Sequence, residues 1–213
     1  MNIIYLLFHG LSPYSGISKK ILHQVKGFEA CGHRVSLCTY SIADNGHRVR
    51  MINNEIIEDY GTGKPAAAKR RVSYQCIYRY AVTHQVELIY VRSFHNANPF
   101  TIRLFSKLRK AGIKIAMEIP TYPYDSEYAG FPLVTRLGIQ VDKVFRKTLA
   151  KHVNAIVTFS DYHCIFGQRT IQISNGVDFD SIPLKKTVAK NTSVIHLLGV
   201  AEVHYWHGYD LSL

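Results

Sequence analysis

The residues whose types could support chemistry follow the apolar segments of this chain. Arg92 and His95 come directly after the apolar segment 88–91, and Glu118 and Tyr122 stand at the end of the next such segment. A guanidinium and an imidazole bind anionic or polar groups, and a carboxyl group among apolar neighbours can act as a base or orient a ligand. The simpler alternative is that Arg92 forms a structural ion pair, His95 caps the next helix, and Glu118 is satisfied by backbone donors or a neighbouring arginine.

A glycine turn near the N-terminus is a second candidate site. Ser15 and Gly16 precede an expected helix, and Lys19 and Lys20 lie in its first two turns. Because glycine has no Cβ, backbone N–H groups and the positive helix N-terminus can approach a phosphate there. The alternative is a plain strand-to-helix turn, since the chain has no G-x-G-x-x-G motif.

The elements that must position these residues alternate between apolar runs and segments of helical period. This pattern predicts an α/β protein with a doubly wound, mostly parallel, Rossmann-like sheet. Strands are expected at 2–8, 34–40, 49–58, 88–91, 113–119, 155–159 and 170–174. Helices are expected at 17–31, 64–85, 99–111, 132–152 and 161–166, the last capped by Ser160 and Asp161. Ligands of such sheets bind beyond the carboxyl ends of the strands, where the candidate residues stand.

The expected helix 132–152 follows a segment, 120–131, that is rich in Tyr and Pro and is predicted to be an exposed loop. The helix is expected to turn one apolar stripe inward, namely Leu133, Leu137, Val141, Val144, Phe145 and Leu149. The loop aromatics and the basic residues of the helix could together contact a membrane surface that carries a lipid-linked substrate. These residues are Tyr122, Tyr124, Tyr128, Phe131, Arg136, Lys143, Arg146, Lys147 and Lys151. The alternative is a solvated basic face.

Composition limits the function further. The 213 residues include 26 Lys and Arg against 15 Asp and Glu, so a net charge of +11 favours anionic partners. No nucleic-acid-binding motif is present, and nucleic acid is therefore not expected as a partner.

The four cysteines have no paired spacing, which predicts reduced, mostly buried thiols in a cytoplasmic protein and no metal site. The apolar N-terminal segment lacks a basic leader and is broken at His9–Gly10, so a buried strand is expected there.

Taken in order, six segments resemble the N-terminal half of a group 1 (family 4) glycosyltransferase of the two-domain GT-B type. The first three are the glycine loop at 15–21, a G-H-x-V strand entry at 30–35 and the middle strand at 89–92. The other three are a later strand that ends in Ser at 154–160, an N-G-V-D element at 173–178 and a K-G-x-D element at 207–210. In the last element His207 stands in place of Lys.

The resemblance implies transfer of a sugar from a nucleotide-sugar co-substrate to a glycan or lipid-linked acceptor, with neither metal nor cofactor. It implies that Ser15, Gly16 and Lys19 lie near the donor phosphate. It places Arg92, His95, Glu118 and Tyr122 on the acceptor side, and Asn175, Gly176 and Asp178 between the two domains. It assigns no catalytic residue, because Pro120–Tyr122 stands where many members carry a histidine.

The expected domain organisation is an acceptor-side domain over 1–178, a linker over 179–192, and the start of a donor domain over 193–213. On this hypothesis the missing donor domain is a further partner of the chain, and the chain alone is inactive. The expected location is the cytoplasm, at the inner face of the membrane if the acceptor is lipid-linked. Two alternatives stay open, a non-catalytic Rossmann-like binding domain and a nucleotide-dependent sugar epimerase.

Overall fold

The computed structural model describes residues 1–93, 95–124, 133–176 and 178–182. The chain divides into two compact units, Met1–Val177 and Asp178–Leu213. Of the second unit, the described residues form a single 3-10 turn, η2 (Phe179–Ser181).

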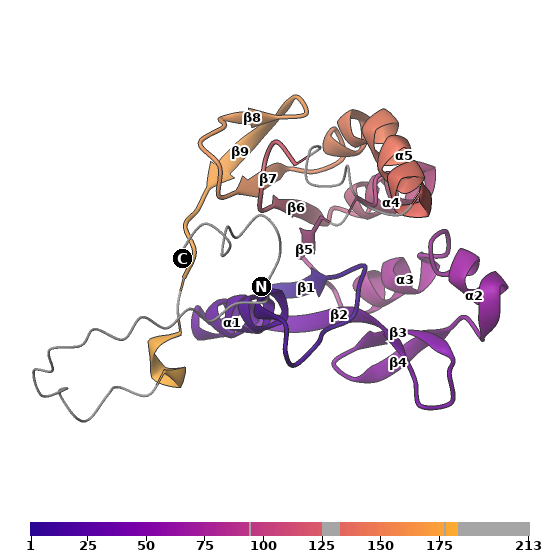
Figure 1. Ribbon diagram of the computed structural model, residues 1–213. Coiled ribbons are helices and arrows are strands. Elements are labelled where there is room, and N and C mark those ends of the chain that lie inside the picture. The colour runs from indigo at the N-terminus through magenta and orange to yellow at the C-terminus, as the bar shows by residue number, and fades with distance from the viewer. Residues whose placement is uncertain (94, 125–132, 177, 183–213) are drawn as a thin grey trace, which may run out of the picture. The chain divides into compact units, whose positions relative to one another are not determined.

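The first unit contains a nine-stranded sheet in the order β4-β3-β2-β1-β5-β6-β7-β9-β8, which can be followed in Figure 1 from the purple β4 to the orange β8. Neighbouring strands from β2 to β9 pair in parallel, and the two ends of the sheet are antiparallel hairpins. The strands are β1 (Asn2–Leu6), β2 (Arg34–Ile42), β3 (Arg48–Ile52), β4 (Glu55–Asp59), β5 (Leu88–Arg92), β6 (Lys114–Ile119), β7 (Ala155–Thr158), β8 (Cys164–Ile165) and β9 (Gln168–Gln172).

Helices cover both faces of this sheet, which confirms the predicted doubly wound α/β class. Alternate residues of β1 point to opposite faces, so Ile3 and Tyr5 pack under α1 while Ile4 and Leu6 join the larger core. That core also holds residues of α3, α4 and α5. The helices are α1 (Gly16–Ala30), α2 (Gly63–Lys69), α3 (Gln75–Thr83), α4 (Pro99–Lys110) and α5 (Leu133–Ala150).

Two predicted elements are wrong because short turns were missed. The expected strand 49–58 is the hairpin β3–β4, which turns at Asn53 and Asn54 with φ of 47° and 71°. The expected helix 161–166 is instead β8 and the start of a hairpin that turns at Phe166 and Gly167, so Ser160 and Asp161 cap no helix. Two positive φ angles in a row give the twist that a two-residue hairpin needs. In the first hairpin two asparagines adopt these angles without any glycine, and in the second Phe166 adopts one beside Gly167.

The expected helix 64–85 is two helices. α2 ends at Lys69, and α3 begins at Gln75. The buried side chain of Tyr60 lies against the turn between them and donates a hydrogen bond to the carbonyl oxygen of Ser73 at 3.2 Å. A contact between segments this distant along the chain leaves no trace in helical periodicity.

The inward face predicted for the helix 132–152 is also wrong for most of its residues. Leu133, Leu137, Val141 and Val144 are exposed, whereas Leu149 is buried and Phe145 half-buried as expected. The buried side of α5 instead contains Ile139, Asp142, Leu149 and Ala150. Asp142 lies on this buried side, and its carboxylate accepts a hydrogen bond from the backbone N–H of Ala97 at 2.9 Å.

We predict that two glycines of the β1–α1 connection respond differently to alanine. A Cβ at Gly10 would lie 2.9 Å from the carbonyl oxygen of Tyr40, whereas a Cβ at Gly16 would meet no atom within 4 Å. Gly10→Ala should therefore lower the free energy of unfolding by about 1–3 kcal/mol. Gly16→Ala should leave it unchanged or raise it by up to about 1 kcal/mol. Urea unfolding measures both, and equal effects would contradict the tight contact at Gly10.

Candidate functional site

The sequence-predicted residues lie at the carboxyl ends of neighbouring parallel strands. Arg92 ends β5 and pairs in register with Glu118 of β6, so the two side chains point to the same face of the sheet. This is the face covered by α1, the helix that Gly16 begins. The structure thus brings Gly16, Arg92 and Glu118 to one side of the molecule.

Glu118 is the centre of a buried polar network. Its carboxylate is fully buried and forms an ion pair with the guanidinium of Arg92. Tyr90 and Gln24 both donate hydrogen bonds to its Oε2, at 2.7 and 2.9 Å. Tyr5 in turn donates to Oε1 of Gln24 at 2.6 Å. Three donors occupy most of the acceptor positions of this carboxylate, so the structural alternative for Arg92 and Glu118 matches this geometry.

The two tyrosines of this network remain donors across the accessible pH range. Burial raises the pKa of Tyr90, and the neighbouring Glu118 carboxylate raises it further. The same two causes, in the same order, raise the pKa of Tyr5. A phenol that stays protonated keeps its hydrogen bond, so both tyrosine donors of the network persist near neutral pH.

The N-terminus of α1 has an ordered cap and an open backbone. The Ser15 hydroxyl accepts a hydrogen bond from the backbone N–H of Ser18 at 3.4 Å, which makes Ser15 the N-cap. Gly16, the first residue of the helix, faces open space. Lys19 is exposed, whereas the ammonium of Lys20 lies 3.5 Å from the centre of the Phe159 ring. Burial lowers the pKa of Lys20, and Glu118 partly opposes that effect.

His95 and Tyr122 belong to a different cluster, on the face of the sheet covered by α4 and α5. The His95 ring lies 4.9 Å from the ring of Tyr124, measured between centres. The ring of Tyr122 lies 5.0 Å from that of Tyr162 and 5.5 Å from that of Phe166. The four predicted acceptor-side residues are therefore divided between the two faces, two on each.

This second cluster corrects two expectations. Tyr124 is buried and donates a hydrogen bond to Asp142 at 3.3 Å, although the segment 120–131 was predicted to be exposed. His95 does not cap the next helix, because Asn98 is the N-cap of α4 and accepts hydrogen bonds from the backbone N–H groups of its first turn. Burial raises the pKa of Asp142 above the ordinary value of an aspartate.

The remaining predicted residues form no part of either cluster. Asn175 and Gly176 are exposed at the end of the first unit, and Asp178 begins the second unit. Tyr128, Phe131 and the segment 183–213, which includes His207, lie outside the described residues. Their predicted roles stay predictions.

Arg50 is a functional candidate that the sequence did not reveal. It is 1% exposed and donates a hydrogen bond to the carbonyl oxygen of Leu7, at the end of β1, at 2.7 Å. Its Nε is buried without a hydrogen-bond partner. Buried Cys38 lies beside it as a neutral thiol, because burial raises the pKa of Cys38 to about 12. A buried guanidinium without a carboxylate is costly, which makes this position unusual.

Three further arginines surround this position. Arg48 donates a hydrogen bond to the hydroxyl of Tyr40 at 2.6 Å, and the guanidinium carbon of Arg70 lies 4.2 Å from the centre of the same ring. Burial lowers the pKa of Arg70, and the positive charges of Arg71, Arg48 and Arg50 add to this effect. None of the four forms an ion pair with a carboxylate of the described residues. This arginine cluster therefore gathers four guanidinium groups that form no ion pair within the described residues, with Glu58 the cross-strand neighbour of Arg50.

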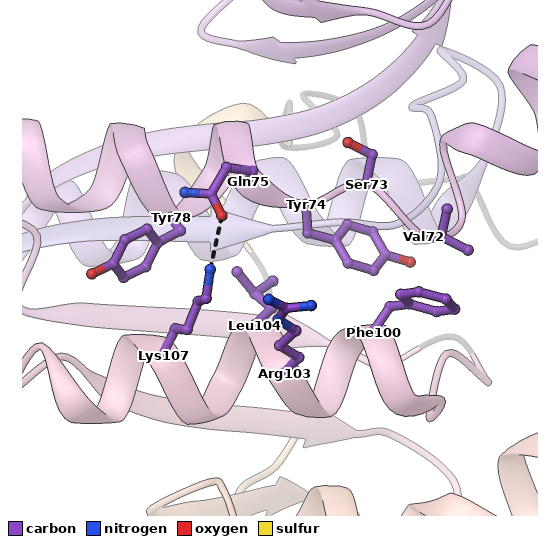
Figure 2. A pocket seen from close by; sticks show the side chains of 9 residues that line it. All are labelled: Val72, Ser73, Tyr74, Gln75, Tyr78, Phe100, Arg103, Leu104 and Lys107. Carbon is purple, nitrogen blue, oxygen red and sulfur yellow. Dashed lines mark hydrogen bonds between the residues drawn. The ribbon is translucent and has the colours of Figure 1, made fainter.

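A groove of about 350 Å³ lies between α3 and α4 (Figure 2). Lys107 of α4 reaches across it and donates a hydrogen bond to the side chain of Gln75 at 3.1 Å. The lining residues are Val72, Ser73, Tyr74, Gln75, Tyr78, Phe100, Arg103, Leu104 and Lys107. They include none of the sequence-predicted site residues.

When the chain is compared with protein-family models, with curated proteins and with solved structures, none matches it. In the described part of the chain, no helix is long and apolar enough to span a bilayer. Within the same residues, no cluster of three or more His, Cys, Asp or Glu side chains could hold a metal ion.

We predict that Glu118→Gln lowers the free energy of unfolding by about 3–5 kcal/mol, because it leaves the Arg92 guanidinium buried without its counter-charge. Adding Arg92→Met should recover part of this loss, since the unpaired charge is then gone. Urea unfolding at neutral pH of the two single variants and the double variant measures the coupling. A loss below about 1 kcal/mol for Glu118→Gln would contradict the role given to the ion pair.

We predict that Arg50→Met leaves the free energy of unfolding unchanged or raises it by up to about 3 kcal/mol, because an apolar side chain of similar length removes an unpaired buried charge. Arg79→Met, at an exposed position of α3, is the matched control and should change the value by less than about 0.5 kcal/mol. Chemical unfolding compares the two. A loss above about 2 kcal/mol for Arg50→Met would mean that its hydrogen bond to Leu7 outweighs the cost of burial.

Proposed function

We propose that this chain supplies the acceptor side of a glycosyltransferase, which moves a sugar from a nucleotide-sugar donor to a glycan or lipid-linked acceptor. The observation that carries the proposal is the open backbone of Gly16 at the N-terminus of α1, on the same sheet face as Lys20 and Arg92. On this proposal, Ser15, Gly16 and Lys19 lie near the donor phosphate.

The chemistry of this region suits a diphosphate. The first N–H groups of α1 carry the positive end of the helix dipole, and an anion placed there gains hydrogen bonds as well as charge. The side chains of Lys19 and Lys20 add positive charge within the first two turns. In a sugar transfer, such donors stabilise the negative charge that develops on the departing nucleoside diphosphate.

On this proposal, the acceptor binds near the carboxyl ends of β5 and β6. Arg92 and Glu118 hold one another, so their contribution is to keep this edge of the sheet rigid, and the pair adds no net charge to it. His95 and Tyr122, on the other face, present an aromatic surface of the kind that packs against sugar rings. The proposal assigns the catalytic base to no residue of this chain.

Titration calorimetry with uridine and guanosine diphosphate sugars tests the donor side. We expect measurable binding by the whole chain, and a loss of about tenfold or more in affinity for Gly16→Leu, because a side chain there displaces the phosphate from the helix N-terminus. Gly27→Leu is the matched control, since Gly27 lies in the same helix with equally open space around it. It should leave the affinity unchanged.

The outcomes separate the alternatives. Equal effects of the two leucine variants would remove Gly16 from the site. An absence of binding for every nucleotide sugar would contradict the placement of the donor phosphate at the N-terminus of α1. Rapid sugar transfer by this polypeptide alone would contradict the expectation that a separate donor domain is needed.

A further inference from the structure

The outer face of α5 combines an apolar stripe with positive charge. Leu133, Leu137, Val141 and Val144 are 68%, 58%, 45% and 71% exposed. Their spacing of four, four and three residues places them on one side of the helix, over a length of about 16 Å. No other helix in the described ranges exposes more than two large apolar side chains.

This stripe is not an extension of the core. The opposite side of α5 packs through Ile139, Leu149 and Ala150, and α5 also contacts α4 (Figure 1). The hydrogen bonds that Asp142 accepts from Ala97 and Tyr124 lie on that inner side as well. The inner side thus fixes the rotation of α5, and the apolar stripe must point away from the sheet.

The charges beside the stripe have one sign. Arg136 and Lys147 are exposed, and each follows a stripe residue by three positions, which places it next to the stripe on the helix surface. The one acidic residue of α5 is Asp142, which is buried on the inner side. A partner of this surface must therefore accept apolar side chains and carry negative charge.

We propose that the outer face of α5 is a docking surface for an anionic phospholipid bilayer, in which the apolar stripe enters the headgroup region while Arg136 and Lys147 contact lipid phosphates. A helix that lies in the plane of the interface has this combination of an apolar face and flanking cations. The net charge of +11 attracts the chain to such a surface from a distance. The proposal does not depend on sugar transfer, and its test needs no nucleotide.

Co-sedimentation of the whole chain with vesicles tests this surface. We expect binding to vesicles of phosphatidylcholine mixed with phosphatidylglycerol, and much weaker binding to phosphatidylcholine alone. Leu137→Gln combined with Val144→Gln should weaken binding by about tenfold for each side chain, because each is buried in the interface. Leu22→Gln combined with Val82→Gln is the matched control, since both residues are 47% exposed on other helices. It should leave binding unchanged.

A second pair of variants separates local from overall charge. Arg136→Glu with Lys147→Glu should weaken binding by at least about fivefold for each cation removed. Arg79→Glu with Lys110→Glu changes the net charge by the same amount at exposed positions of α3 and α4, and should have a clearly smaller effect. Equal effects of the two pairs would mean unspecific attraction and would overturn the proposal.

Two other results would also overturn it. One is an absence of binding to both kinds of vesicle. The other is a stable dimer in analytical ultracentrifugation that Leu137→Gln with Val144→Gln dissociates, since the stripe would then be covered by a second copy of the chain. Because all substituted side chains are exposed, circular dichroism should show that every variant keeps its fold.

Discussion

The buried ion pair between Arg92 and Glu118 is the interaction that holds together the carboxyl ends of the parallel strands. It joins β5 to β6, and the hydrogen bonds from Tyr90 and Gln24 tie the same carboxylate to the sheet and to α1. Tyr5 extends the network into β1 through Gln24. Leaving either charge alone in the interior would be costly, so the network holds three adjacent strands in register and ties α1 to them.

The second constraint is an excess of positive charge near the carboxyl end of β1. Arg50 is buried against the end of β1, and Arg48 and Arg70 flank Tyr40. None of these three arginines forms an ion pair among the described residues. Together with the lysines of α1, these groups give this end of the unit a positive field. Such a field favours phosphorylated ligands whether the chain acts in sugar transfer or only binds a partner.

The sequence was sufficient for the fold class and for most elements. The strands that become β1, β2, β5, β6 and β7 are short apolar runs followed by turn signals, and parallel strands buried on both faces leave that pattern. The hairpin at Asn53–Asn54 and the break at Ser73 were missed. In the first case asparagine adopts a conformation usually marked by glycine, and in the second a distant tyrosine contacts the backbone.

By itself, the sequence determined which residues stand at the carboxyl ends of the strands, because that depends only on local periodicity and chain order. Tertiary structure alone decided that Arg92 meets Glu118 while His95 and Tyr122 lie on the opposite face. It also decided which way α5 faces. A helical period shows that apolar residues share one side, but the direction of that side is set by packing, and here the contacts of Asp142 with Ala97 and Tyr124 lie on the side that faces the sheet.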